Sequence, residues 1–332
     1  MPATALDAST LETLISAATA APSMHNTQPW RYRLDPDSVT LEVRAVPERG
    51  LRHADPTGRA LHISVGTSLF NLRVAVAHFG WEPAVRLLPR PDEPDLLATV
   101  RMSAAVRSGT SHRADLHEAI WRRHSSRFPF SDRRPPPAVR TELVEAAHVE
   151  GSALSFPARS ETERLLRLTF DAERRNTADP DRSAESRRWV RDVEGAMGAL
   201  PSLAPGPQDS RGRLPMREFT ARRHREQPPP RDFERSPAIA VLTTEHDGRT
   251  DWLRAGQALE HVLLAATAHG LQASLLHQAM EWPDLRRSLR TPVLHGTHVQ
   301  MLIRFGYGPQ GPTTSRRPPS QVLDIPAGSA RD

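Results

Sequence analysis

The stretch Gly66-Thr-Ser-Leu-Phe-Asn-Leu-Arg-Val-Ala-Val-Ala-His-Phe-Gly80 carries the pattern that decides the fold. Its apolar residues recur at intervals of three and four and it closes on a glycine, which predicts a buried helix with a glycine cap. A segment of the same form runs from Gly256 to Gly270 and begins 190 residues later. Because the two segments share length, terminal glycines and apolar spacing, we expect an internal duplication.

A second pair of similar segments predicts where the two copies differ in length. The segment that begins at Leu14 resembles the one that begins at Leu143, and both predict short amphipathic helices, 129 residues apart. The offset therefore grows by about 61 residues between the two pairs. We expect a first half over residues 1–115 and a second half over 116–332, with the extra residues inserted at about 176–235.

The expected insertion at about 176–235 is rich in proline and arginine. One helix is predicted within it, at residues 186–200, with an apolar face that includes Trp189, Val193 and Met197. Such a segment is either an irregular, disordered loop or a lid over a site. The apolar face favours the lid.

Short segments rich in valine, isoleucine and leucine predict strands in both halves. They are residues 40–46, 84–88, 97–102, 238–243 and 298–305. Together with the helices, they predict an α+β fold in which two half-repeats are built around antiparallel sheets.

Composition excludes several classes of site. The chain has no cysteine, which excludes disulfides, thiolate metal sites and iron–sulfur clusters. All 44 basic residues are arginine, but the net charge is only +5 and is spread along the chain, so we expect no nucleic-acid partner. The histidines, among them His53, His62, His78 and His277, are scattered, which indicates surface or capping roles and no metal site.

The N-terminal residues do not have the pattern of a secretory leader. No apolar run approaches the roughly 18 residues that a membrane span needs. We therefore expect a cytoplasmic protein without membrane contact.

The stretch Ala21-Pro-Ser-Met-His-Asn-Thr-Gln-Pro-Trp30 follows the first predicted helix. Its prolines, with Ser23 and Asn26, stop the helix and predict a rigid turn that directs backbone N–H groups and short polar side chains to one side. Taken alone, the stretch is equally typical of a helix end in which Trp30 anchors the core.

The stretch Arg123-His-Ser-Ser-Arg127 places two arginines and two serines within five residues. Arginine makes charge-assisted, bidentate hydrogen bonds to phosphate, and serine adds a hydroxyl donor. The pattern is suited to phosphate binding, although alone it is also typical of a solvated basic turn.

Together the two stretches resemble the FMN site of the nitroreductase family. Members carry an Arg-(His/Arg)-Ser-x-(Arg/Lys) motif and, further along, an Ala-Pro-Ser-x-x-Asn-x-Gln-Pro-Trp motif. The resemblance implies that the first motif holds the flavin phosphate and ribityl chain, and that the second reaches the flavin from the other subunit of a homodimer. Carried over to this chain, it assigns FMN contacts to Ser23, Met24, Asn26, Gln28, Arg123, His124, Ser125 and Arg127.

The order of the two motifs is inverted here, and the duplication accounts for it. The second-half copy of the turn is expected near residues 151–156, where Asn, Gln, Pro and Trp are all missing. The first-half copy of the arginine stretch would precede Met1. One complete site then survives between the halves, which resembles the Acg-like branch of the family, whose single chains imitate the dimer.

The resemblance extends weakly to two further regions. After the strand at 298–305, it implies a phosphate-binding arginine before a proline, which is either Arg316 or Arg317. Near the N5 edge of the flavin it places backbone groups at Leu275 to Gln278, including His277, although the usual glycine is absent there.

The function that the resemblance implies is that of an FMN-dependent oxidoreductase. It would take a hydride from NAD(P)H and pass electrons to a small nitro, quinone or flavin acceptor. The chemistry takes place on the flavin, so we assign no catalytic side chain and no metal. The alternative is an FMN storage or sequestration protein whose lid blocks turnover.

Overall fold

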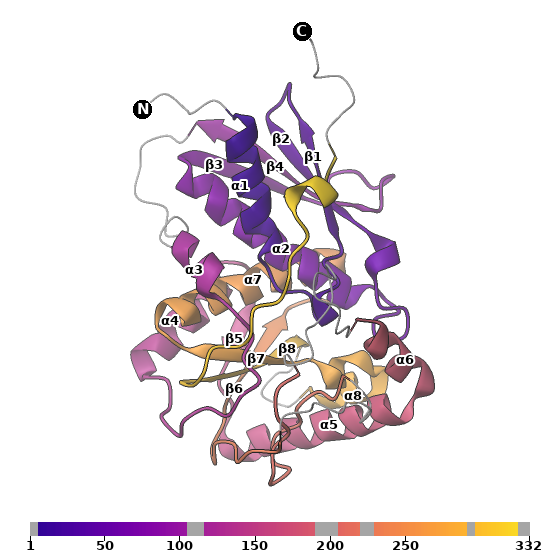
Figure 1. Ribbon diagram of the computed structural model, residues 1–332, viewed down its shortest axis with the longest axis vertical. Coiled ribbons are helices and arrows are strands. Elements are labelled where there is room, and N and C mark those ends of the chain that lie inside the picture. The colour runs from indigo at the N-terminus through magenta and orange to yellow at the C-terminus, as the bar shows by residue number, and fades with distance from the viewer. Residues whose placement is uncertain (1–5, 105–115, 190–204, 220–228, 291–295, 325–332) are drawn as a thin grey trace.

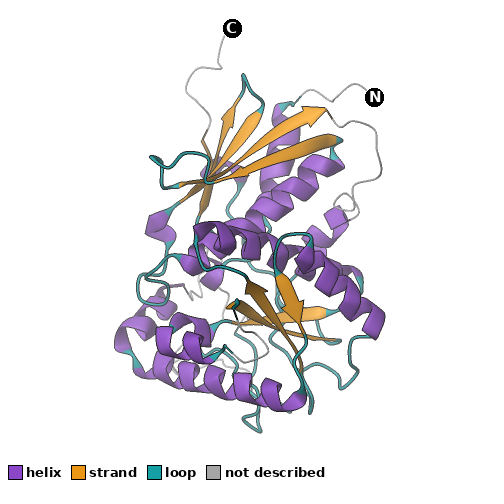
Figure 2. Cartoon of the chain, turned by 180° about the vertical axis from the view of Figure 1, so that it is seen from behind, coloured by secondary structure: helices purple, strands orange, loops and turns teal. Residues whose placement is uncertain are grey.

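Two sheets form opposite ends of the molecule, and two long helices lie between them (Figures 1 and 2). The computed structural model describes residues 6–104, 116–189, 205–219, 229–290 and 296–324. The expectation of an α+β fold is confirmed.

The first sheet has five strands in the order β3-β4-β2-β1-β9. All neighbours are antiparallel except β9, which pairs parallel with β1. The strands are β1 (Trp30–Asp35), β2 (Thr40–Ala45), β3 (Trp81–Leu87), β4 (Leu96–Ala104) and β9 (Leu323–Asp324). The last of these comes from the far end of the chain, so the second half completes the sheet of the first.

The second sheet has four antiparallel strands in the order β5-β6-β8-β7. They are β5 (Ala153–Ser155), β6 (Ala238–Thr244), β7 (Gln272–Leu276) and β8 (His298–Gly306). In both sheets, two strands precede a long helix and two follow it, and the four strands lie in the same order. This correspondence supports the duplication that the sequence predicts.

The two segments with matching glycines form the long helices α2 (Arg59–His78) and α7 (Arg249–Ala268), which pack against each other. Gly66 and Gly256 lie at the crossing, where a Cβ built on Gly256 would lie 2.7 Å from the Cα of Gly66. By length and composition α2 could cross a membrane, which the sequence did not lead us to expect, but 83% of its apolar window is buried. It is the central core helix of the first half.

The shorter predicted helices are also present, as α1 (Ala8–Thr19) and α4 (Pro137–His148). Two further short helices are α3 (His117–Arg122) and α8 (Pro283–Ser288). Single 3-10 turns lie at η1 (Met24–Asn26), η2 (Pro47–Arg49), η4 (Gln278–Glu281) and η6 (Pro319–Gln321).

The segment between β5 and β6 is longer than the insertion that we expected at 176–235. It begins with α5 (Arg159–Ala178) and α6 (Pro180–Trp189), which pack along the second sheet's end of the molecule (Figure 1). The predicted helix at 186–200 overlaps α6 only at its start, and the rest lies outside the described residues. If the chain is duplicated, the extra residues therefore start directly after β5.

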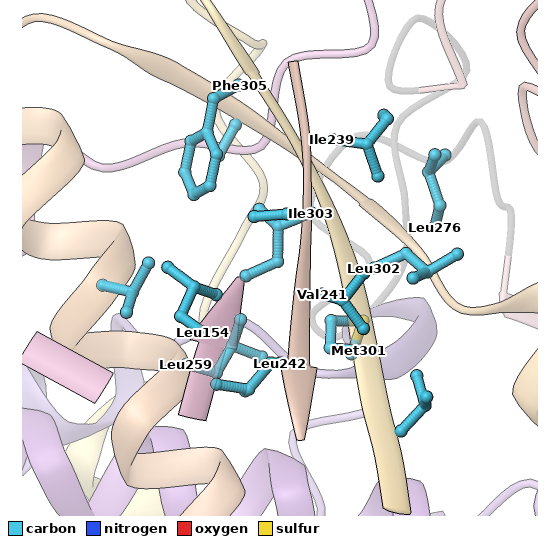
Figure 3. Close-up of a cluster of buried hydrophobic side chains, with 14 of the residues drawn as sticks. Leu154, Ile239, Val241, Leu242, Leu259, Leu276, Met301, Leu302, Ile303 and Phe305 are labelled. Carbon is cyan, nitrogen blue, oxygen red and sulfur yellow. The ribbon is translucent and has the colours of Figure 1, made fainter. Parts of the chain in front are cut away.

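Each half has its own apolar core. In the second half, strands β6 and β8 direct Val241, Leu242 and Ile303 into a cluster that also includes Leu259 of α7 (Figure 3). In the first half, α2 contributes Leu69, Leu72 and their neighbours to a second cluster. Burial of this kind stabilises each sheet–helix layer.

All five predicted strands are confirmed, with ends that differ by up to three residues. Strands β1, β5, β7 and β9 were not predicted. The expected surface or capping role is wrong for His277, which lines the apolar cavity described below, whereas the buried His62 bonds the carbonyl of Gly58 at the start of α2.

Candidate functional site

The turn at residues 22–29 joins α1 to β1 and has a fixed shape. Ser23 Oγ accepts a hydrogen bond from the backbone N–H of Gln28 at 2.9 Å. His25, Asn26 and Gln28 have positive φ angles of 53°, 57° and 50°. Residues other than glycine rarely adopt this region, so the surrounding contacts must impose the conformation.

Helix α2 supplies contacts that hold the turn. Thr67 Oγ1 donates to the carbonyl of Pro22 at 2.8 Å, and Ser64 Oγ accepts from the backbone N–H of Met24 at 3.3 Å. Trp30, which is fully buried, anchors the turn where β1 begins. The stretch therefore both ends a helix and presents a shaped surface.

The amides of Asn26 and Gln28 bond the C-terminal segment. Asn26 Nδ2 donates to the carbonyl of Ser315 at 3.0 Å, and Asn26 Oδ1 accepts from Arg316 Nη1 at 2.9 Å. Gln28 Oε1 accepts from the backbone N–H of Arg317 at 2.8 Å. The turn thereby fixes a segment almost 290 residues away in sequence, and with it the position of Arg316.

The arginine stretch at residues 123–127 follows α3 and lies along the edge of the second sheet. Ser126 donates its backbone N–H to Ala273 of β7 at 2.8 Å and its hydroxyl to the carbonyl of Pro309 at 2.7 Å. Gly311 packs directly on the carbonyl of Ser125, where any Cβ would overlap it. The sequence also has a Gly-x-Gly-x-x-Gly pattern at 306–311, but no helix begins within residues 306–318, so it is not a dinucleotide motif.

Two arginines from distant parts of the chain converge on the end of α1. Arg123 Nη2 and Arg316 Nη2 both donate to the carbonyl of Ala20, at 3.1 and 3.3 Å. Behind them, the buried carboxylate of Glu260 on α7 lies 3.3 Å from Arg123 Nε. Among the described residues, Arg316 makes hydrogen bonds only to neutral oxygens.

Burial perturbs the charges of this cluster. It lowers the pKa of Arg316 to about 9, with Arg123 adding repulsion. It raises the pKa of the Glu260 carboxyl to about 7, against the attraction of Arg123 and Arg316. Both shifts have one cause, which is that a low-dielectric interior disfavours charge. An anion that bound Arg316 would offset this penalty.

Two adjoining cavities lie where the turn, the arginine stretch and the C-terminal segment meet. The polar cavity is lined by residues of all three: Pro22, Ser23, His25, Asn26, Arg123, His124, Ser125, Arg127, Pro312, Thr314 and Arg316. The apolar cavity is lined by the turn, α2 and the second sheet: Pro22, Ser23, Met24, His25, Arg59, Ala60, Ile63, Ser64, Thr67, Ser125, Arg127, Phe219, Leu259, Leu275, His277 and Met301. The five residues common to both mark where the cavities meet.

The wall of the apolar cavity is aromatic and positively charged. Phe219, from the segment between β5 and β6, lies edge-on to His25 with ring centroids 5.2 Å apart. The guanidinium of Arg127 lies 4.9 Å from the centre of the Phe219 ring. Burial, and then repulsion by Arg217, holds the pKa of both His25 and His277 well below its usual range, so both rings are neutral.

A third, outer cavity of about 250 Å³ adjoins the apolar cavity. The two share Met24, Arg59 and Ala60, at the start of α2 and in the turn. Burial lowers the pKa of Arg59 to about 10, and its Nη1 donates to the carbonyl of Gln300 at 2.9 Å. The outer cavity, which is lined mainly by polar and charged residues, is thus a neighbour of the apolar one.

Most residues predicted for the site lie together. Those that line one or both cavities are Ser23, Met24, Asn26, Arg123, His124, Ser125, Arg127, Leu275, His277 and Arg316. Gln28, Gln278 and Arg317 line neither of them. Gln278 Nε2 instead donates to the carbonyl of Pro215, and the side chain of Arg317 reaches Gln321 at 3.4 Å.

Sequence reasoning missed several residues that line or support these cavities. His25 occupies a variable position of the turn motif, so the motif gave no signal for it. Phe219 belongs to the proline-rich insertion, and Glu260 lies on a helix that was read only for its apolar spacing. Arg59 follows the Asp-Pro-Thr-Gly stretch that starts α2, and no pattern singled it out.

Across the described residues, no group of three or more histidine, aspartate or glutamate side chains is placed to hold a metal ion. The charged groups at the cavities are mainly arginines, which are donors to anions.

Comparison with known proteins gives matches over most of the chain. Residues 120–307 match the nitroreductase family. The putative NAD(P)H nitroreductase Rv3131 of Mycobacterium tuberculosis is 33% identical over 327 residues, which cover 96% of this chain and 92% of that protein. The putative NAD(P)H nitroreductase acg of the same organism is 29% identical over the full length of both chains.

Solved structures give more distant matches. A putative nitroreductase from Anabaena variabilis aligns with 91% of this chain and 88% of its own, at 11% identity and a TM-score of 0.46. A nitroreductase with bound FMN from Bacteroides fragilis aligns with 66% of this chain and 98% of its own, at 15% identity and a TM-score of 0.35.

Proposed function

Since the chain belongs to the nitroreductase family, we propose that it binds one FMN between its two halves and acts as an NAD(P)H-dependent oxidoreductase. The observation that carries the proposal is the meeting of the turn at 22–29 with the arginine stretch at 123–127 around two adjoining cavities. One cavity is polar and cationic, and the other is aromatic and apolar. A flavin mononucleotide has the same division, with a phosphate at one end and a flat ring at the other.

The donor set of the polar cavity fits a phosphate. Arg123 and Arg316 converge on one carbonyl, and among the described residues Arg316 donates hydrogen bonds only to neutral oxygens. Arg127 lines the same cavity, and burial lowers its pKa to about 10. A phosphate bound there would accept charge-assisted hydrogen bonds from these arginines and so offset the free-energy cost of burying their charges.

The residues that would hold the cofactor come from three segments. Arg123, Ser125 and Arg316 would bind the phosphate, with His124 beside them. Ser23 lines both cavities and has a hydroxyl that can donate to the ribityl chain. Asn26 and Gln28, whose amides bond residues 315–317, would act by fixing Arg316 in place.

When bound, FMN would supply the centre that accepts a hydride and passes electrons on. Arg59, which is buried at the edge of the apolar cavity, would stabilise negative charge on a reduced ring. The outer cavity that meets the apolar one at Arg59 would admit NAD(P)H and a small nitro, quinone or flavin acceptor.

One observation favours a second candidate, FMN storage. Phe219 is 1% exposed and lies against His25 inside the apolar cavity. Its segment is tied down, because Arg217 forms a buried ion pair with Glu281 and the backbone N–H of Glu218 donates to Glu173 at 2.7 Å. In this function the segment before residue 220 would act as a lid that keeps NAD(P)H from the flavin.

FMN and riboflavin binding by apoprotein tests the proposed cofactor, because the two flavins differ only in the phosphate. Arg316→Ala should weaken FMN binding by about a hundredfold and leave riboflavin binding within about twofold, since it removes a charge-assisted contact to phosphate. Arg317→Ala is the matched control, because this neighbouring side chain points to Gln321 and should leave both affinities unchanged. Equal losses for FMN and riboflavin, or none, would contradict the phosphate assignment.

A further inference from the structure

Most hydrogen-bonding side chains of the turn at 22–29 are paired within the protein, and one is not. Ser23 Oγ accepts from the backbone of the turn, and the amides of Asn26 and Gln28 bond residues 315–317. Within the described residues, both ring nitrogens of His25 are buried and have no hydrogen-bond partner. Within the turn at 22–29, His25 is therefore the residue whose side-chain polar atoms are all buried and without a partner.

His25 lies where the two cavities meet. Its side chain lines both the polar and the apolar cavity, and the residue is only 4% exposed. Phe219 packs edge-on against the ring at 5.2 Å, and the ring of His277 lies 6.4 Å away between centroids. Within the described residues neither neighbour supplies a hydrogen bond, so the ring lines both cavities with its two nitrogens unpaired.

The backbone at His25 is held in an unfavourable conformation. Its φ of 53° lies in the left-handed region, which costs a residue other than glycine free energy. A buried, unpartnered imidazole adds a desolvation penalty. Two costs at one residue are typical of a site where the surrounding fold maintains a binding geometry.

We propose that His25 is a direct ligand of the bound flavin, through hydrogen bonds at the junction of its ribityl chain and its ring. This inference rests on the proposed function, and it names a contact that the family's turn motif leaves as a variable position. A neutral imidazole has one N–H donor and one nitrogen acceptor, which matches the donor and acceptor character of a ribityl hydroxyl. The polar cavity takes the phosphate, so the junction of the two cavities falls at the polyol.

The neutral state of the ring suits this role. Burial opposes a second proton on His25, and the guanidinium groups of Arg217 and Arg127 add repulsion, so the pKa of His25 lies well below its usual range. A protonated imidazole would have two donors and no acceptor. The cavity thus keeps the one form of histidine that can both donate and accept.

His25→Gly tests the contact without straining the backbone, because glycine adopts a φ near 53° with no steric penalty. The variant should unfold at the same temperature as the parent or higher, yet bind FMN about tenfold more weakly, with a changed visible spectrum. Imidazole at millimolar concentration should restore much of the affinity by refilling the space. Val39→Gly, at another residue with positive φ outside the cavities, is the matched control and should bind FMN as the parent does.

Two results would overturn the inference alone. One is FMN binding by His25→Gly with the affinity and spectrum of the parent. The other is a loss of affinity that imidazole does not restore, which would assign the effect to the loosened turn. By contrast, a parent protein that binds no FMN would overturn the proposed function and this inference with it.

Discussion

The two halves of the chain share a scaffold and differ in their connections. The first half joins α1 to β1 through the long turn at 20–29, whereas the second joins α4 to β5 through residues 149–152 alone. The next connection differs in the opposite direction. A tight hairpin at 36–39 joins β1 to β2, whereas residues 156–237 join β5 to β6. Each half therefore has one long connection, in a different place.

Both long connections contribute to the apolar cavity. The first supplies His25 and Ser23, and the second supplies Phe219. The corresponding connections of the other half have neither feature, because residues 149–152 are too short for such a turn and the hairpin at 36–39 is too short for a cover. The difference explains why a scaffold with two similar halves would hold one flavin and not two.

The largest effect is expected at the feature that the halves share, the glycine crossing of α2 and α7. A Cβ on Gly256 would overlap the carbonyl oxygen of Ile63 and lie 2.7 Å from Gly66 Cα, and neither backbone atom can move without shifting a helix. Gly256→Ala should therefore lower the free energy of unfolding by about 4 kcal/mol. Urea denaturation measures this.

Gly248→Ala is the matched control for that substitution. Its Cβ would approach only the flexible carboxylate of Asp251, at 3.3 Å, at the start of the same helix. The control should lose less than about 1 kcal/mol. Similar losses in the two variants would show that the crossing is not the constraint that joins the halves.

The next effect concerns a position at which the two long helices differ. Glu260 of α7 corresponds to Phe70 of α2, at the 190-residue offset, and both are buried. Burial raises the pKa of Glu260 to about 7, above its value in the unfolded chain, so the folded state binds the proton more tightly. Its contribution to stability is thus fully present below about pH 4.5 and is lost as the pH rises through 7.

Glu260→Gln removes this titration. The difference in unfolding free energy between parent and variant apoproteins should change by up to about 3 kcal/mol between pH 5 and pH 8, with the parent losing stability relative to the variant. Denaturation at both pH values measures the difference. Parallel stability profiles would mean that Arg123 already keeps Glu260 ionised at pH 5.

A smaller effect is expected at Phe219, which the long connection between β5 and β6 contributes to the apolar cavity. If the segment that carries Phe219 limits access, Phe219→Ala should speed the bleaching of bound flavin by NADPH or NADH about tenfold, since it removes a ring that lines the apolar cavity. Phe219→Leu keeps most of the bulk and serves as the control, with a rate near that of the parent. Rapid bleaching of the parent and an unchanged rate in Phe219→Ala would exclude storage and the lid together.

The parts of the fold that were predictable from sequence have local causes. Strands such as β6 and β8 contain apolar runs, at residues 238–242 and 301–303, and the long helices carry a period that burial requires. Strand β1 was missed although Trp30, Tyr32 and Leu34 alternate with polar residues, because the stretch was read only as the end of a motif. Strand β9 has two residues and exists only through pairing with β1.

In the candidate site, too, only the parts with a local cause could be predicted from sequence. The arginine stretch and the turn were recognisable as motifs, because each is contiguous in sequence. The partners of Asn26 and Gln28 lie almost 290 residues away, so no local pattern could show that these amides bond the segment of Arg316. The choice between Arg316 and Arg317 likewise depends on how that segment passes the turn: the side chain of Arg316 lines the polar cavity, and that of Arg317 does not.

The smallest effects are expected at residues 322–324, the tail of the second half, which adds β9 to the first sheet. Val322 is 1% exposed, and its carbonyl accepts from the backbone N–H of Tyr32 at 2.7 Å. Asp324, at the end of β9, forms an ion pair with Arg31 at 3.7 Å in which both side chains are about half exposed. If packing and main-chain pairing hold the tail, Val322→Ala should cost about 1 kcal/mol of unfolding free energy.

Asp324→Asn should cost less than about 0.5 kcal/mol, because solvent screens an exposed ion pair. The two variants, compared by denaturation in low and high salt, separate the two kinds of contact. A larger loss for Asp324→Asn that disappears in high salt would mean that charge, and not the buried valine, attaches the tail. Because the tail also carries Arg316 past the turn, that outcome would make the geometry of the polar cavity sensitive to ionic strength.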